Sequence, residues 1–311
     1  MDSFRMEQGG RVDTIHRFDA IPTPLSWPFD RPEPVEHWLF DPKGPKPRMD
    51  EPTILLTNDD GIDATGIRAV YDGLSEVGEV VAVAPATDQS AVGRKLSHEV
   101  RVRDHELGYV VEGTPSDCVV AGLEALVPET DLVVAGCNRG ANLGAYTLGR
   151  SGTVSAAVEA TFFDVPAIAV SMYIPVREDT AFSDLEADAE SYDEAVRATS
   201  YLTDHALDAS VFDQCDYLNV NAPVAEKGRA PLAVTRPSQV YEMTAAHNGD
   251  AVTLHDRIWE QMAEGSIPDP EGTDRRAVVD GTVSVSPLTA PHTTEHHEAL
   301  DALAETYDPS E

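Results

Sequence analysis

Short apolar runs alternate with segments of helical periodicity along most of the chain after residue 52. Thr53–Thr57 and Val80–Ala84 are apolar runs typical of buried parallel strands. Between them, apolar residues recur at helical spacing from Ile67 to Val77, and we expect Gly78 to end this helix as a C-terminal cap. The resulting β-α-β unit predicts parallel strands joined by a right-handed crossover.

The alternation of strands and helices continues to about residue 223. We expect further strands at Tyr109–Val111, Asp131–Ala135, Ala167–Ser171 and Tyr217–Asn221, and helices at Val154–Phe163 and Ala187–Leu207. Another helix is expected to start at Thr114, with Thr114 as N-cap, Pro115 at the first position and Asp117 at the third. This order predicts the α/β class, with a doubly wound, mostly parallel sheet.

The start of the chain differs in composition from the rest. Residues 1–51 contain a dense run of prolines, which excludes a long helix and a central strand. We interpret this region as an N-terminal extension. Three interpretations are open: an ordered arm, a flexible extension, or sequence upstream of the true start. The third arises because Met49, four residues before the first predicted strand, is a plausible initiator.

The remaining chain divides into a core and a C-terminal region. We assign residues 52–224 to the α/β catalytic core. Residues 225–311 form the C-terminal region, in which the strand and helix pattern weakens. We expect residues 225–285 to be an excursion of hairpins and loops with no obvious way to bury its own apolar residues. Within the C-terminal region, Thr282–Val285 is expected to return as a strand and Thr294 to about Tyr307 to form a polar helix.

The net charge of the chain disfavours some classes of binding partner. It has 22 basic and 55 acidic residues, a formal net charge of −33, which disfavours nucleic-acid duplexes and anionic membranes. The acidity is typical either of a disordered acidic protein or of a folded protein from a high-salt cytoplasm, and the apolar runs favour the second. The three cysteines form no CxxC pair, and no apolar run is long enough to span a membrane, so we expect a cytoplasmic protein.

Two acidic residues follow the first predicted strand. Ligands of parallel α/β sheets bind at the carboxyl ends of strands, where Asp59 and Asp60 lie, and Gly61 permits the backbone to turn there. Adjacent carboxylates repel each other unless a proton or a cation intervenes, so the pair indicates a hard divalent metal. The alternative is a solvated turn with a helix N-cap. A dinucleotide-binding fold would place glycines here instead.

Two later loops leave the same edge of the predicted sheet. Gly136–Gly144 carries three glycines and two amide side chains, and is interpreted as a binding loop or as a flexible surface loop. Ser151-Gly152-Thr153 opens a helix whose amides can hold an anion, although such a sequence is also an ordinary N-cap. The convergence of acids and an anion-type helix start favours a phosphate-handling site.

These segments together resemble the survival protein SurE family of 5′/3′-nucleotidases. The resemblance spans roughly residues 53–305, while residues 1–50 have no counterpart in the family's core pattern. The motifs that carry it are Ile54–Gly61, Ala84-Pro85 with Asp88-Gln89-Ser90, Gly113–Val119, Gly136–Gly144 followed by Ser151–Ala157, Leu218–Pro223, and Gly272-Thr273-Asp274 with Ser284–Thr289.

The resemblance implies a phosphatase that uses one divalent ion, Mg²⁺ or Mn²⁺, to hydrolyse nucleoside 5′- and also 3′-monophosphates. Asp59 and Asp60 would be the catalytic residues. The implied metal ligands are Asp59, Asp60, Ser90 and Asn138, and the implied phosphate-binding residues are Asn142, Ser151, Gly152 and Thr153. A homodimer or homotetramer, with the C-terminal excursion exchanged between subunits, is also implied.

Two departures from the family pattern lie beside these residues. Ala91 stands where glycine is usual, and Arg150 stands where an aromatic residue is frequent. Arg150 would be an extra phosphate clamp or a solvated surface charge, and we favour the latter. Two other functions stay open: a broad phosphomonoesterase or exopolyphosphatase, and a non-catalytic protein that binds metal and nucleotide.

Overall fold

The computed structural model describes residues 51–175, 187–224 and 229–290. All of these residues belong to one compact unit, Pro47–Glu311. The predicted N-terminal extension therefore lies outside the described residues except for Glu51, and so does the predicted helix from Thr294.

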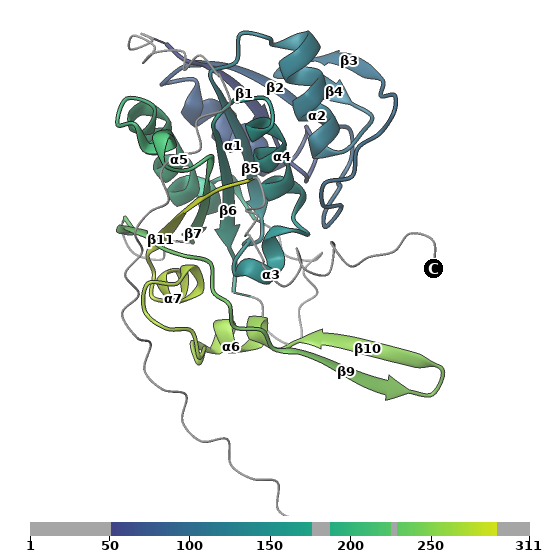
Figure 1. Cartoon of the computed structure of the whole chain (residues 1–311), viewed down its shortest axis with the longest axis vertical. Coiled ribbons are helices and arrows are strands. Elements are labelled where there is room, and N and C mark those ends of the chain that lie inside the picture. The colour runs from purple at the N-terminus through teal and green to yellow at the C-terminus, as the bar shows by residue number, and fades with distance from the viewer. Residues whose placement is uncertain (1–50, 176–186, 225–228, 291–311) are drawn as a thin grey trace, which may run out of the picture. The chain divides into compact units, whose positions relative to one another are not determined.

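A nine-stranded sheet forms the centre of this unit, in the order β3-β4-β2-β1-β5-β6-β7-β11-β8 (Figure 1). Its pairings are parallel except for β3 with β4 and β11 with β7. The strands are β1 Thr53–Thr57, β2 Glu79–Pro85, β3 Val102–His105, β4 Gly108–Val111, β5 Leu132–Arg139, β6 Ala167–Tyr173, β7 Tyr217–Pro223, β8 Leu232–Val234 and β11 Val283–Leu288. This is the mostly parallel sheet that the sequence predicts.

Helices cover both faces of the sheet (Figure 1). Along β1, Ile54 and Leu56 pack in a core with α1 and α5, whereas Leu55 packs in a second core with α2 and α4. Alternate residues of a strand point to opposite faces, so the uninterrupted apolar run of β1 supplies both cores. The helices are α1 Thr65–Leu74, α2 Pro115–Ala121, α3 Ala145–Leu148, α4 Gly152–Thr161, α5 Asp193–Ala206, α6 Ile258–Glu264 and α7 Asp274–Val279. The doubly wound α/β fold is confirmed.

The predicted start of α2 is confirmed in detail. The Thr114 hydroxyl accepts a hydrogen bond from the Asp117 N–H at 3.2 Å, and the Asp117 carboxylate accepts one from the Thr114 N–H at 2.8 Å. This reciprocal capping box satisfies two amides that a helix start leaves without partners. The prediction for α1 is wrong at its end, because the helix stops at Leu74. Gly78 instead lies where a Cβ would come within 2.5 Å of the Pro52 carbonyl oxygen.

Strand β5 is longer than predicted. It continues through Gly136 and Cys137 to Arg139, with an irregularity in its pairing to β6 between Ala135 and Asn138. The first part of the predicted loop Gly136–Gly144 is therefore strand. The extra length carries Asn138 beyond the point where a five-residue strand would end.

The region after residue 225 contributes both to the sheet and to a projecting hairpin. Strands β8 and β11 pair with the main sheet, so the predicted boundary at 224/225 does not separate two sheets. The expected hairpin is formed by β9 Met243–Asn248 and β10 Ala251–Asp256, and α6 and α7 are helices that the sequence pattern did not indicate. Val252 and Leu254 of the hairpin are 56% and 71% exposed.

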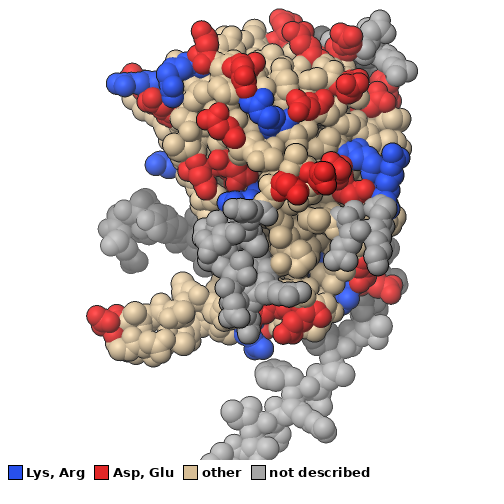
Figure 2. Space-filling view, turned by 180° about the vertical axis from the view of Figure 1, so that it is seen from behind, with Lys and Arg blue, Asp and Glu red and all other residues tan. Residues whose placement is uncertain are grey.

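On the face of the molecule that Figure 2 shows, acidic side chains are spread over the described residues, with fewer Lys and Arg among them. This distribution places the excess of negative charge in contact with solvent. None of the described helices is long and apolar enough to cross a membrane.

Candidate active site

Three neighbouring strands bring the predicted site residues to one edge of the sheet. Strands β2, β1 and β5 are adjacent and parallel, so their carboxyl ends lie together. The loop after β2 is tied to the loop after β1 by a 2.7 Å hydrogen bond from the Gln89 N–H to the Asp59 carbonyl oxygen. After β1, the Asn58 side chain bonds both the N–H and the carbonyl of Gly61, whose φ of +104° only glycine adopts readily. The local sequence thus fixes the turn that carries the two aspartates.

Asp59 is buried and held by the start of α4. Its Oδ1 accepts a 2.5 Å hydrogen bond from the Thr153 hydroxyl, and its Oδ2 accepts one of 3.1 Å from the Thr153 N–H. A Cβ on Gly152 would lie 2.8 Å from both Cβ and Oδ2 of Asp59, so only glycine allows this approach. The structure therefore places three predicted residues in contact, although 94 positions separate Asp59 from Thr153.

Asp60 is held from the other side by β5. Its Oδ2 accepts a 2.9 Å hydrogen bond from the Arg139 N–H. Because Arg139 follows Asn138, this bond draws the end of β5 against the aspartate pair. This hydrogen bond to Asp60 is made by the last residue of β5, in the part of the strand that extends beyond Ala135.

Burial makes both carboxylates reluctant to ionise. It raises the pKa of Asp59 to about 6, with the Asp60 charge adding to the rise and the Thr153 hydrogen bonds opposing it. The pKa of Asp60 is also raised, chiefly by burial and further by the Asp88 charge. A cation between the two carboxylates would remove this penalty, so their surroundings fit a bound metal ion.

The other two predicted metal ligands present oxygen atoms. The Ser90 hydroxyl donates to Asp88 Oδ1 at 2.6 Å, which leaves the lone pairs of its oxygen available. The amide nitrogen of Asn138 donates to the Gly140 carbonyl at 2.5 Å, so its Oδ1 is turned elsewhere. An all-oxygen set of ligands suits Mg²⁺ or Mn²⁺. Among the described residues there is no cluster of three His, Cys, Asp or Glu that would indicate a different kind of metal site.

The predicted phosphate loop is braced by buried polar groups. The Asn142 N–H donates to Asn221 Oδ1 at 2.8 Å, and the Asn142 side-chain amide donates to the Ser171 hydroxyl at 2.9 Å. The Asn142 carbonyl accepts from the side chains of Asn219 and Asn221 at 2.9 and 3.2 Å. Two asparagines in a fully buried strand were a visible signal for this role, since buried amides require partners.

The sequence reasoning did not assign a role to Asp274, which also fixes this loop. One Asp274 oxygen accepts from the Gly144 N–H at 2.7 Å, and the other accepts from the Ser238 and Arg275 N–H groups at 2.9 and 2.8 Å. The fully buried Asp274 therefore joins the C-terminal region to the loop that carries Asn142.

The remaining predicted phosphate residues lie at the start of α4. The Ser151 hydroxyl accepts a 3.1 Å hydrogen bond from the Val154 N–H and caps the helix. Ser151, Gly152 and Thr153 are all buried. Thr153 directs its hydroxyl and its N–H to Asp59, so the helix start and the aspartate pair form one unit. Arg150 is exposed, and its guanidinium lies over the Tyr146 ring at 3.5 Å from the centroid.

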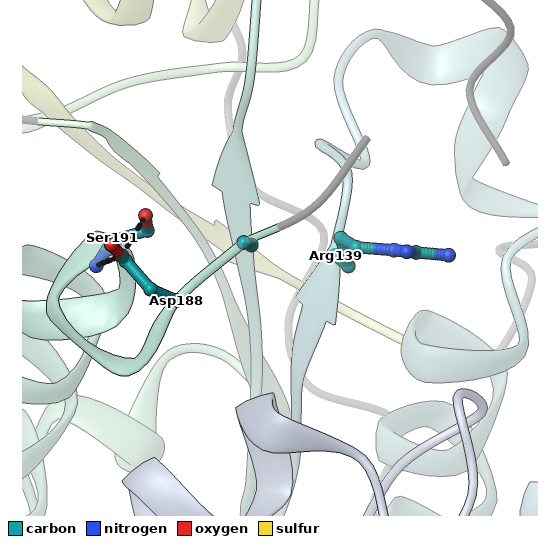
Figure 3. A pocket seen from close by; sticks show the side chains of 4 residues that line it. Arg139, Asp188 and Ser191 are labelled. Carbon is teal, nitrogen blue, oxygen red and sulfur yellow. Dashed lines mark hydrogen bonds between the residues drawn. The ribbon is translucent and has the colours of Figure 1, made fainter. Parts of the chain in front are cut away.

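A pocket of about 630 Å³ opens beside Arg139. It is lined by Arg139, Ala187, Asp188 and Ser191. Figure 3 shows Asp188 and Ser191 on one side of this pocket, with the Arg139 side chain directed away from them. Asp188 caps the turn before α5, where its Oδ1 accepts from the Ser191 N–H and hydroxyl at 3.0 and 2.7 Å.

Comparison with known proteins identifies the family. The profile of the family described as Survival protein SurE matches residues 54–244. The chain belongs to the survival protein SurE family. The resemblance in the sequence is therefore confirmed.

Individual SurE relatives match most of the chain. A protein of Haloarcula marismortui named 5′-nucleotidase SurE is 80% identical over 263 residues, which cover 85% of this chain and 98% of that protein. One of the same name from Haloquadratum walsbyi is 65% identical over 256 residues, which cover 82% and 97%. These relatives come from halophilic archaea, which agrees with the high-salt cytoplasm that the acidic composition favours.

A solved SurE structure has the same fold. The crystal structure of the SurE protein from Aquifex aeolicus superposes with a TM-score of 0.66 at 31% identity, covering 82% of this chain and all of that one.

Proposed function

We propose that this SurE chain is a hydrolase that releases phosphate from nucleoside 5′-monophosphates, leaving the nucleoside. The relatives that match it over 97% or more of their length carry the name 5′-nucleotidase SurE. The observation that carries the proposal is the pair of buried Asp59, fixed against the helix start that begins at Ser151, and half-buried Asp60, fixed by the Arg139 N–H. Acids alone would repel a phosphate, whereas acids that hold a cation would attract one.

One divalent ion, Mg²⁺ or Mn²⁺, completes the proposed site. Asp59, Asp60, Ser90 and Asn138 would hold it through oxygen atoms. When bound, the ion supplies positive charge against the phosphoryl oxygens and makes water a better nucleophile. The chain itself supplies fixed geometry, because Thr153 and the Arg139 N–H hold the two carboxylates. One of these carboxylates accepts the proton that the attacking water loses.

The phosphate is held in this proposal by the start of α4 and by the Asn142 loop. Amide groups at a helix start carry partial positive charge and point toward an anion. Ser151, Gly152 and Thr153 form that start, where Thr153 also holds Asp59 through its N–H and hydroxyl. The hydrogen bonds of Asn142 to Asn221 and Ser171 fix the loop in advance. Groups that are already oriented need no reorganisation when charge develops on the phosphoryl oxygens.

We further propose that residues 52–224 carry the catalytic core and that residues 225–311 serve assembly into a homodimer or homotetramer. The β9–β10 hairpin exposes Val252 and Leu254, and a two-stranded hairpin is marginally stable on its own. A second copy of the chain would cover these side chains. The three cysteines are free and buried, in keeping with a cytoplasmic location.

Phosphate release from a panel of substrates tests the proposed activity. The panel contains 5′- and 3′-mononucleotides, glycerol phosphate and short polyphosphate, each in molar KCl with Mn²⁺ and again with a chelator. We expect release from 5′-mononucleotides that the chelator abolishes. Equal rates with every phosphomonoester would favour the broad phosphatase, and nucleotide binding without release would favour the non-catalytic protein.

Variants of two acidic residues identify the site. Asp59→Asn should nearly abolish phosphate release. Asp63→Asn is the matched control, because Asp63 lies four residues away with its side chain 86% exposed. Turnover like that of the wild type in Asp59→Asn would remove Asp59 from the mechanism.

A further inference from the structure

A cluster of two tyrosines and one arginine lies next to the proposed phosphate site and has no role in the mechanism above. The Arg150 guanidinium lies over the Tyr146 ring, 3.5 Å from its centroid. The Tyr241 ring meets the Tyr146 ring edge to face, with centroids 4.2 Å apart and an angle of 62° between the planes. We call Tyr146, Arg150 and Tyr241 the aromatic cluster.

The aromatic cluster is next to the elements that carry the proposed phosphate site, and a hydrogen bond connects it to the loop of Ser90. Arg150 directly precedes Ser151, the cap of α4, and consecutive Cα atoms are about 3.8 Å apart. The Arg150 carbonyl also accepts a 3.2 Å hydrogen bond from the Gly93 N–H, in the loop that carries Ser90. Figure 1 shows α3, which carries Tyr146, near the tip of β6, where the carboxyl ends of the strands lie.

Tyr241 reaches the same place from the C-terminal region. It precedes β9, and the chain before it is held by a 2.8 Å hydrogen bond from the Ala145 N–H to the Ser238 carbonyl. Although it contacts Tyr146, Tyr241 is 51% exposed. A large aromatic side chain left half in water beside an anion site provides a flat surface for a planar group of the ligand.

We propose that the aromatic cluster binds the base of the nucleotide, with the base stacked on Tyr241 and flanked by Arg150. This inference rests on the proposed function. In a nucleoside monophosphate a single sugar separates the base from the phosphate, so the surface that binds the base must lie close in space to the phosphate site. Stacking on aromatic rings and guanidinium groups holds bases with little regard to sequence, because every base has a π face.

The pocket beside Arg139 is another place near the site, within the described part of the chain, that could receive the base. Its lining residues are Arg139, Ala187, Asp188 and Ser191, which include no aromatic ring. Hydrogen bonds inside the protein already occupy Asp188. The aromatic cluster offers the better surface for stacking.

The test compares Tyr241→Ala with Tyr241→Phe and with a matched control. Tyr201→Ala is that control, because Tyr201 is 56% exposed and stacks on His205 of α5, away from the aromatic cluster. For Tyr241→Ala we expect the KM for AMP to rise about tenfold at unchanged kcat. Tyr241→Phe keeps the ring and should keep the KM, as should Tyr201→Ala.

Ribose 5-phosphate, which lacks a base, separates base binding from a general disturbance. Its inhibition constant against AMP should be the same in the wild type and in Tyr241→Ala, whereas adenosine should inhibit the variant about tenfold more weakly. A loss of assembly or of the phosphate site would change both inhibition constants together. Unchanged KM for AMP in Tyr241→Ala, or equal changes for both inhibitors, would overturn the inference. If the wild type released no phosphate from AMP, the proposed function itself would fail, which is a distinct result.

Discussion

Replacing Asp59 by asparagine should stabilise the metal-free protein while it removes the activity. The substitution deletes a buried negative charge and keeps the shape of the side chain. Asparagine can retain both contacts with Thr153, because its oxygen accepts from the Thr153 N–H while its amide donates to the hydroxyl. The change therefore isolates the cost of the charge.

The magnitude follows from the pKa of Asp59, which burial raises from 3.8 to about 6. Because each pKa unit corresponds to 1.36 kcal/mol, the ionised carboxylate lowers the free energy of unfolding by about 3 kcal/mol at pH 7.5. The folded state binds the proton more tightly than the unfolded state does, so this penalty grows as the pH rises from 3.8 and is complete above pH 6. At pH 5 roughly half of the penalty remains.

The assay is urea unfolding in molar KCl with a chelator, at pH 7.5 and at pH 5. We expect Asp59→Asn to be more stable than the wild type by about 3 kcal/mol at pH 7.5 and by about half of that at pH 5. The control Asp63→Asn should change the stability far less at both pH values, because the Asp63 side chain is 86% exposed and its contact with the His105 ring, at 3.3 Å, is a surface ion pair.

Adding Mn²⁺ should reverse the order. A ligand at one thousand times its Kd stabilises a protein by about 4.1 kcal/mol, which exceeds the lead of about 3 kcal/mol that the variant has in chelator, and only the wild type should gain this. An Asp59→Asn variant that is less stable than the wild type in chelator would refute the reasoning. It would mean that the charge of Asp59 is already compensated without a cation.

Three further predictions concern packing, capping and salt. Gly152→Ala should lower phosphate release more than tenfold and destabilise the fold by about 1–3 kcal/mol, because its Cβ would lie 2.8 Å from Asp59; wild-type activity would contradict this. Thr114→Ala removes the hydroxyl that caps α2 and should lower the free energy of unfolding in urea by about 1 kcal/mol, with the rate of phosphate release unchanged. A fall in that rate as large as the one expected for Gly152→Ala would place α2 in the site. The thermal unfolding midpoint should rise steeply from 0.1 to about 2 M KCl as the acidic surface is screened, and a midpoint independent of salt would exclude halophilic adaptation.

Elements with strong local signals were predictable from the sequence. Strand β1 follows from its apolar run, and α2 follows from Thr114, Pro115 and Asp117, whose capping bonds span three residues. Strand β3 was missed because its residues, Val102–His105, are mostly exposed and charged, as edge strands often are. The end of α1 was misplaced because Gly78 is required by the nearby Pro52 carbonyl, a tertiary contact rather than a helix cap.

Local signals in the sequence indicated candidate residues for the site but not their geometry. The acids after β1 and the helix start at Ser151 both carry local signals. The hydrogen bonds of Asp59 to Thr153 and of Asp60 to Arg139 join residues 94 and 79 positions apart, and sequence spacing contains no information on such contacts. The role of Asp274 also depends on the fold, because it binds the Gly144 N–H across 130 positions.

Counting Mn²⁺ ions by electron paramagnetic resonance tests the central claim most directly. The wild type and a variant that combines Asp59→Asn with Asp60→Asn would be titrated with Mn²⁺ in molar KCl. We expect one tight ion per wild-type chain and at least a hundredfold weaker binding in the variant, which should remain folded. Equal Mn²⁺ binding by the two proteins would contradict the assignment of the metal to this aspartate pair.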